Sequence, residues 1–112
     1  MDRRQSLLIP HLFDITNYAY WKVRMKTFLQ ALDEKVWLVV EVGWKKPSEP
    51  PANWDDGKIK VTNFNSRALN ALFSGVTNEE FKKILSTEIA KEAWTMLETT
   101  YEDTKAVKTV KL

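Results

Sequence analysis

The sequence predicts an all-α protein, a compact bundle of five to six helices, and three observations support this fold class. Apolar residues recur at helical spacing over residues 13–32, 58–74 and 90–101. Residues typical of helix starts and stops separate these stretches. The continuous apolar run at residues 36–40 has no second β-branched run to pair with, and a lone strand would leave its backbone groups unpaired.

Length and composition limit the classes of protein to which this chain can belong. A chain of 112 residues suits one domain with a single core. The chain has no cysteine, which excludes disulfides and thiolate zinc sites and fits a reducing compartment. Its apolar runs are too short to span a membrane, and the N-terminus lacks the apolar segment of a signal peptide. We therefore expect a cytoplasmic protein without membrane contact.

The first residues predict an arm, over residues 1–12, ahead of one helical domain over residues 13–112. Pro10 limits helix continuation in this arm. An apolar patch precedes the domain, and it consists of Leu7, Leu8, Ile9 and Leu12. We expect the patch to pack on the domain, with an exposed hook for a neighbouring subunit as the alternative.

The stretch at residues 13–32, FDITNYAYWKVRMKTFLQAL, predicts the helix on which the core is built. Thr16 or Asn17 offers an N-cap for it. One face holds six large side chains, Tyr18, Trp21, Met25, Phe28, Leu29 and Leu32. This face is rich in aromatic rings, so its burial should contribute strongly to the core.

A short helix is predicted next, from Glu34 to Val42. Asp33 offers its N-cap and Gly43 can end it. The run VWLVV within it also fits a buried strand, but the missing partner strand favours a short buried helix.

Residues 43–57, GWKKPSEPPANWDDG, predict a long proline-rich loop bracketed by two tryptophans, Trp44 and Trp54. We expect the two indoles to attach the loop to the body of the domain. The alternative is a ligand site built from the same two indoles.

Two further helices follow the loop. The first runs from about Lys58 to Ser74, with a wide apolar face that includes Phe64 and Leu72, and Gly75 stops it. Thr77 and Glu80 match a capping box that opens a short helix, whose apolar residues are Phe81, Ile84 and Leu85.

The last part of the chain predicts one more long helix and a short terminal one. Ser86 or Thr87 leads into a helix whose apolar face holds Ala90, Ala93, Trp94, Leu97 and Tyr101. Thr104 can cap a final segment, AVKTVKL, which ends without a stop signal and is therefore expected to be a truncated helix.

Few residues suit catalysis or cofactor binding. His11 is the only histidine and lies in the predicted arm, which is a poor place for a serine–histidine–aspartate site. The sequence has no cluster of histidine or cysteine for a metal and no glycine-rich phosphate loop. We expect no catalytic, cofactor-binding or metal-binding residue, and no enzyme activity.

The charge pattern does not predict nucleic-acid binding. Seventeen basic and fifteen acidic residues are interspersed and leave a net charge of +2. Lys105, Lys108 and Lys111 recur every three residues, but a solvated helix face explains them better than phosphate contacts.

The aromatic content indicates recognition rather than chemistry. Five tryptophans, Trp21, Trp37, Trp44, Trp54 and Trp94, exceed what a core of this size needs. For any one of them core packing is the preferred interpretation. We expect some of the five to line a groove or an interface.

Several phrases of the sequence point to a known family. They are FDITNYAYWKVRMKTFLQALD, VWLVVEVG, TNEEFKKI, AKEAWTMLETTYE and TKAVKTVKL, and together they span about residues 13–112. In this order they resemble the Gag polyproteins of copia-type LTR retrotransposons, most closely those of plants. Ile15 departs from the pattern, because the family usually has glycine there.

The resemblance implies a capsid-type helical domain, similar to the N-terminal lobe of retroviral capsids, which self-associates to build a particle shell. Lys22, Arg24 and Lys26, on the polar side of the first helix, then become candidates for contacts between subunits. The second capsid lobe and the RNA-binding zinc knuckle of such proteins have no counterpart in these residues. The alternative is an adaptor derived from a Gag protein that binds a short apolar peptide or a host protein in an apolar groove.

Overall fold

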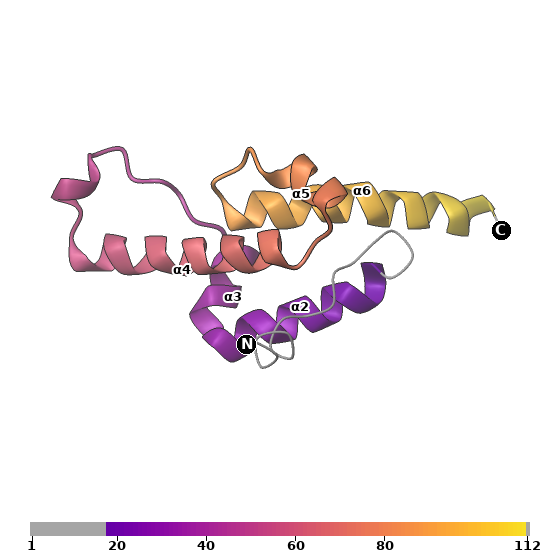
Figure 1. Cartoon of the computed structure of the whole chain (residues 1–112), viewed down its shortest axis with the longest axis horizontal. Coiled ribbons are helices and arrows are strands. Elements are labelled where there is room, and N and C mark those ends of the chain that lie inside the picture. The colour runs from indigo at the N-terminus through magenta and orange to yellow at the C-terminus, as the bar shows by residue number, and fades with distance from the viewer. Residues whose placement is uncertain (1–17, 112) are drawn as a thin grey trace.

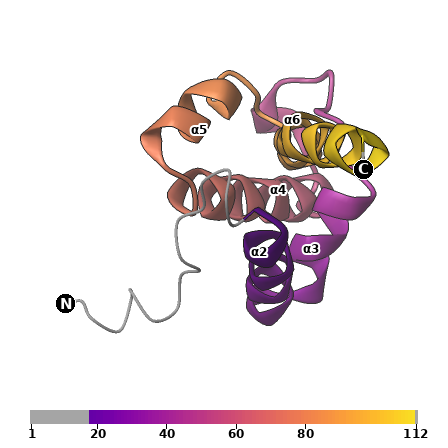
Figure 2. The ribbon, with the colours of Figure 1, turned by 90° about the vertical axis from the view of Figure 1, so that its right-hand side faces the viewer.

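The structure is a computed structural model that describes residues 18–111, with side chains described for residues 18–102. The all-α prediction is confirmed, because the described residues form five α-helices and one short 3-10 helix, without a β-strand. α4 runs through the middle, with α2 and α3 on one side and α5 and α6 on the other (Figures 1 and 2). The predicted arm, with Leu7, Leu8, Ile9 and His11, lies outside the described residues, as do the N-cap candidates Thr16 and Asn17.

The first two helices follow the predicted pattern. α2 spans Tyr18–Leu32 and α3 spans Glu34–Glu41. Asp33 caps α3, since its side chain accepts a hydrogen bond from the Lys35 N–H at 2.8 Å. Gly43 follows the helix with a φ of 108°, a left-handed conformation that glycine adopts without strain.

The run VWLVV belongs to α3 and not to a strand. Four residues of this helix are buried, Val36, Trp37, Val39 and Val40, while Leu38 is exposed. α3 packs against α2, α4 and α6, so this short helix buries four of its eight residues. This contact with three other helices compensates for the moderate helix propensity of valine.

The loop and α4 differ from the prediction only at their junction. The loop contains one 3-10 turn, Pro51–Asn53, and α4 spans Asp56–Ser74, so it begins two residues earlier than Lys58. Asp55 is the N-cap, with its carboxylate accepting from the Lys58 N–H at 2.8 Å.

α5 spans Asn78–Ile84, but the predicted capping box is not formed. Thr77 is the N-cap residue without a side-chain cap hydrogen bond. Glu80 is instead buried and its carboxylate lies 3.3 Å from the Lys83 ammonium.

α6 spans Ala90–Lys111 as one continuous helix, so the prediction of a separate segment capped by Thr104 is wrong. Threonine costs little inside a helix, and no glycine or proline interrupts this one. A buried side chain from α4 holds its first turn. The Asn65 carbonyl oxygen accepts from the Ala90 N–H at 2.9 Å, and the Asn65 amide donates to the Glu88 carbonyl at 2.8 Å.

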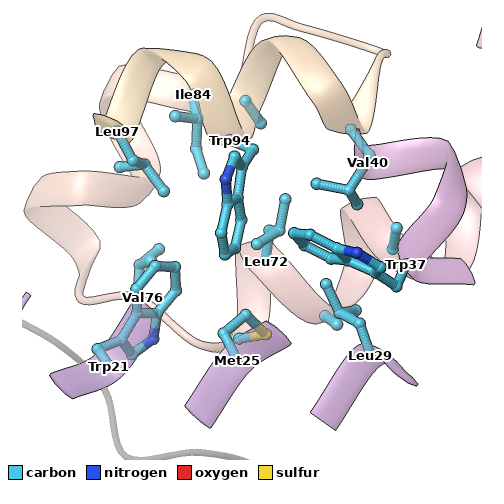
Figure 3. Packing of buried hydrophobic residues seen from close by; sticks show 14 of the residues in the cluster. Trp21, Met25, Leu29, Trp37, Val40, Leu72, Val76, Ile84, Trp94 and Leu97 are labelled. Atoms are coloured by element: carbon cyan, nitrogen blue, oxygen red, sulfur yellow. The ribbon is translucent and has the colours of Figure 1, made fainter. Parts of the chain in front are cut away.

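The core is one cluster of side chains from all five α-helices and from Val76, and Figure 3 shows most of it. Eight residues predicted for the core are buried: Tyr18, Trp21, Met25, Leu29, Leu72, Trp94, Leu97 and Tyr101. Phe28, Phe64 and Phe81 are half-buried and pack against this cluster.

Leu32 was predicted in the core but is 47% exposed. It is the last residue of α2, where the chain turns at Asp33 into α3. The helical spacing places Leu32 on the apolar face, but no neighbouring helix covers that end of the face completely.

Candidate protein-binding surface

A groove of about 370 Å³ lies between α2, α3 and α6. We call it the aromatic groove, and its lining residues are Lys22, Val23, Lys26, Trp37, Val40, Glu41, Lys91, Trp94, Thr95 and Glu98. The size lies in the range of small-ligand and peptide pockets. Two tryptophans and two valines beside charged side chains give it an apolar interior with a polar edge.

Trp37 and Trp94 form the apolar wall of the aromatic groove. Their rings meet edge to face, with centroids 5.3 Å apart and planes at 77°, as Figure 3 shows. The Trp94 indole N–H donates to the Glu98 carboxylate at 3.2 Å, so this polar edge is satisfied within the chain. Both rings are at least nine-tenths buried. They are therefore rigid, preorganised contact surfaces.

Two lysines at the rim of the groove can receive an acidic partner. The Lys26 ammonium lies 5.2 Å from the centre of the Trp37 ring, a cation–π contact. The Lys91 ammonium lies 3.5 Å from the Val42 carbonyl oxygen. Within residues 18–102 neither lysine takes part in an ion pair. Glu41, on the same rim, carries the opposite charge.

The Lys22 side chain forms ion pairs within its own chain. Its ammonium lies 2.8 Å from the Glu98 carboxylate and also pairs with Glu102. Burial lowers the pKa of Lys22, but the hydrogen bonds to Glu102 and Glu98 outweigh this and raise it. The Tyr18 hydroxyl donates to Glu102 at 3.3 Å, and burial, with the charges of Glu102 and Glu98, raises the pKa of Tyr18. These contacts fasten α2 to α6.

Two pairs of exposed apolar side chains lie outside the aromatic groove or at its border. Tyr20 and Val23, three residues apart on α2, are 67% and 66% exposed. Leu38 and Val42, four residues apart at the end of α3, are 49% and 66% exposed. We call them the α2 pair and the α3 pair. Arg24 belongs to the first, because its guanidinium lies 5.8 Å from the Tyr20 ring centre.

A second groove, of about 280 Å³, lies between α2 and α4. Its lining residues are Phe28, Leu32, Arg67, Asn70, Ala71 and Ser74. The exposed part of Leu32 faces this groove. Its rim holds one charged side chain, Arg67, so it offers less polar specificity than the aromatic groove.

Each of the two loop tryptophans makes a hydrogen bond within its own chain, Trp44 to α4 and Trp54 to the loop itself. The Trp44 indole N–H donates to the Thr62 hydroxyl of α4 at 3.2 Å. The Trp54 indole N–H donates to the Glu49 carbonyl at 2.9 Å and closes the tip of the loop. Neither indole lines one of the two grooves described above. The Trp44 contact agrees with the predicted attachment of the loop to the body, whereas the Trp54 hydrogen bond lies within the loop.

The structure thus brings together only part of the predicted interface. Lys22 and Lys26 line the aromatic groove, whereas Arg24, Trp44 and Trp54 lie elsewhere. The sequence analysis did not single out Trp37, Trp94 and Lys91 as groove residues. The surplus of tryptophans was the relevant signal, but it did not tell which of the five would meet across helices.

Neither a metal site nor a membrane helix is found in the part of the chain that the structure describes. Residues 18–102 contain no group of three acidic, histidine or cysteine side chains that could hold a metal ion. No helix among the described residues is long and apolar enough to cross a membrane.

Comparison of the sequence and structure with protein-family models, curated proteins and solved structures finds no match. Function therefore has to be argued from the residues, the grooves and the exposed apolar pairs.

Proposed function

We propose that this chain is a structural domain of a copia-type Gag protein, which self-associates in the cytoplasm to build a particle shell. Two arguments support the proposal. The phrases between residues 13 and 112 resemble such proteins in order and spacing. The all-α architecture is the class expected of a capsid domain. The proposal assigns no catalytic step, no cofactor and no nucleic-acid contact to these residues.

The observation that carries the proposal is the presence of exposed apolar pairs on two different helices. The α2 pair and the α3 pair each place two large side chains next to one another at helical spacing, half to two-thirds exposed. A single such pair would permit only a dimer. Two separate pairs permit each subunit to contact two neighbours, which an assembly larger than a dimer requires. Contacts of this size are individually weak, and their number stabilises the assembly.

Sedimentation velocity over a range of protein and salt concentrations tests this proposal, with electron microscopy of the largest species. The wild-type chain should form oligomers whose size grows with concentration. Leu38→Ser, in the α3 pair, should reduce this association. Leu85→Ser is the matched control, because Leu85 is 50% exposed and Leu38 is 49% exposed. Both replacements should change folding stability by less than about 0.5 kcal/mol, since each side chain is on the surface.

The Gag proposal would have to be abandoned if the wild-type chain stayed monomeric under all of these conditions. If Leu38→Ser and Leu85→Ser reduced oligomer formation to the same extent, the assigned role of the α3 pair would be contradicted. A matching double replacement, Tyr20→Ser with Val23→Ser, examines the α2 pair in the same way.

A second candidate function, binding of a short apolar peptide as an adaptor, is favoured by the aromatic groove. Its buried tryptophan rings and lysine rim suit an apolar residue next to an acidic one. Titration with such peptides should shift the indole N–H resonances of Trp37 and Trp94. Unchanged resonances up to about 1 mM peptide, a binding free energy near −4 kcal/mol, would exclude this function.

A further inference from the structure

We propose that the aromatic groove of one copy receives the proline-rich tip of the 43–57 loop of a second copy. The tip, residues 49–56, is called the knob from here on. The inference rests on the proposed self-association, because it names one interface of that assembly. Four properties of the knob and the groove support it.

The knob is a preorganised structure. The Trp54 indole N–H donates to the Glu49 carbonyl at 2.9 Å, and the Asn53 N–H donates to the Pro50 carbonyl at 2.9 Å. Lys58, from the first turn of α4, pairs with the Glu49 carboxylate. Pro50 has φ −62° and ψ 150°, the polyproline conformation. A segment held in this way loses little conformational entropy when it binds.

The outer surface of the knob is exposed. Pro50, Pro51, Ala52 and Asn53 are all exposed, and the 3-10 turn that contains three of them lies at the far end of the molecule from the C-terminus (Figure 1). Pro50, next to this 3-10 turn, has the polyproline conformation, and proline side chains characteristically dock into grooves lined by aromatic rings. The aromatic groove offers such a wall in Trp37 and Trp94.

The charges of the knob and the groove are complementary. Residues 49–56 contain three carboxylates, of Glu49, Asp55 and Asp56, and no basic side chain. Glu49 is paired within its own chain, and one carboxylate oxygen of Asp55 accepts the Lys58 N–H as the N-cap of α4. Asp56 and the second carboxylate oxygen of Asp55 remain for a partner. In the groove, Lys26 and Lys91 take part in no ion pair among the described residues. The rim also holds one carboxylate in no ion pair among the described residues, Glu41, so its two ammonium groups outnumber it and can meet the aspartates of the knob.

The knob cannot reach the groove of its own chain. It is fixed to the first turn of α4, and Asn65 of α4 contacts the first turn of α6 beside the groove. Asn65 lies nine positions after Asp56 on α4, a rise of roughly 14 Å at 1.5 Å per residue. The occupant is therefore a second copy. Knob and groove are different surfaces, so each copy can bind one neighbour with its knob and another with its groove.

Mutual rescue by mixing two variants of the full chain tests the inference. The groove variant is Lys26→Glu with Lys91→Glu, and the knob variant is Ala52→Lys with Asp56→Lys. All four positions are exposed. Each variant alone should associate at least about tenfold more weakly than wild type in sedimentation, a loss of about 1.4 kcal/mol. An equimolar mixture should regain association, because the unchanged knob of one variant meets the unchanged groove of the other.

Lys82→Glu is the matched control, since Lys82 is an exposed lysine of α5 outside the groove. It should associate as wild type does. Circular dichroism checks that every variant keeps its helices, and regained association in the mixture is itself a sign of folded partners.

Four outcomes would overturn the inference. Wild-type oligomers that persist in both variants would show that another interface is used, while the proposed function stands. If only the groove variant lost association, the groove would be shown to receive a different segment. Failure of the mixture to associate would exclude a contact between knob and groove. A wild-type chain that is always monomeric would overturn this inference and the proposed function together.

Discussion

At the scale of single residues, the core is tightly packed where Trp21, Met25 and Gly75 meet. The Trp21 indole N–H donates to the Gly75 carbonyl at 2.9 Å, and both groups are buried. A Cβ atom on Gly75 would overlap the Cε atom of Met25 and crowd the Ala71 carbonyl. Gly75 has a negative φ, so glycine is needed at this position for its small size rather than for its backbone conformation.

Gly75→Ala should therefore destabilise the fold, by about 1 to 3 kcal/mol, as expected for overpacking of a filled core. Gly57→Ala is the control, since that Cβ would meet only the Asp55 carboxylate at 3.4 Å, an ordinary contact. It should stabilise the fold by about 0.4 to 1 kcal/mol. Chemical denaturation of both variants measures the difference. Equal stabilities would contradict the crowding argument.

Asn65 is the second residue on which the packing depends. Asn65→Ala removes both hydrogen bonds to the turn before α6 and leaves the buried Ala90 N–H without its acceptor. The free energy of unfolding should fall by about 1 to 3 kcal/mol. Asn63→Ala, at an exposed position of the same helix, should change it by less than about 0.5 kcal/mol. Hydrogen exchange at Ala90 should also become faster in Asn65→Ala only.

The sequence predicted the fold class and most of the helices because most of them have a local start or stop signal and an apolar face. The caps Asp33 and Asp55 act over two or three residues, so local sequence determines them. The cap of α6 comes from Asn65, 25 residues earlier, and no local pattern indicates it. The prediction that Leu32 lies in the core was wrong for the same reason, because the exposure of its side chain depends on where the other helices end.

At the scale of elements, α2 and α6 are joined by groups that hold their protons more tightly when folded. Burial, followed by the charges of Glu102 and Glu98, raises the pKa of Tyr18 above its ordinary value of 10.0. Lys22, between the same two carboxylates, also has a raised pKa, from an ordinary value of 10.5. The folded protein therefore binds more protons than the unfolded chain at alkaline pH.

The free energy of unfolding should consequently be constant with respect to these groups below about pH 10 and fall as pH rises further. Denaturation midpoints measured between neutral pH and about pH 11 check this dependence. Tyr18→Phe should give a shallower fall, because one of the two groups no longer titrates. An identical fall in the variant and in wild type would assign the alkaline sensitivity to other groups.

At the scale of the whole molecule, the candidate site could not be predicted from the sequence, although its parts could. Periodicity placed Trp94 on the apolar face of its helix and Lys26 on the polar face of another. The aromatic groove forms where α2, α3 and α6 meet, and apolar and polar residues of these helices lie side by side there. Lys91 becomes a rim residue only through this arrangement. Residue spacing gives the faces of a helix but not the neighbour that each face meets.

Salt separates the two kinds of contact proposed for the assembly. The knob and the groove would form two exposed charge pairs, each about 0.2 to 1 kcal/mol, which salt screens. Raising NaCl to about 1 M should weaken that interface between about twofold and thirtyfold. Apolar contacts of the α3 pair should not weaken. Sedimentation at low and high salt checks this, and association that strengthens throughout would contradict a charged knob contact.

The tryptophans of the core also give the protein an optical signal of its own folding. Trp21 and Trp94 are stacked, with ring centroids 5.9 Å apart, and Trp37 meets Trp94 edge to face. Indoles this close couple their electronic transitions, so α2, α3 and α6 together should produce an exciton couplet in the ultraviolet dichroism spectrum. The couplet exists only while all three helices are docked. Its decay during unfolding would therefore report tertiary packing separately from the loss of helix.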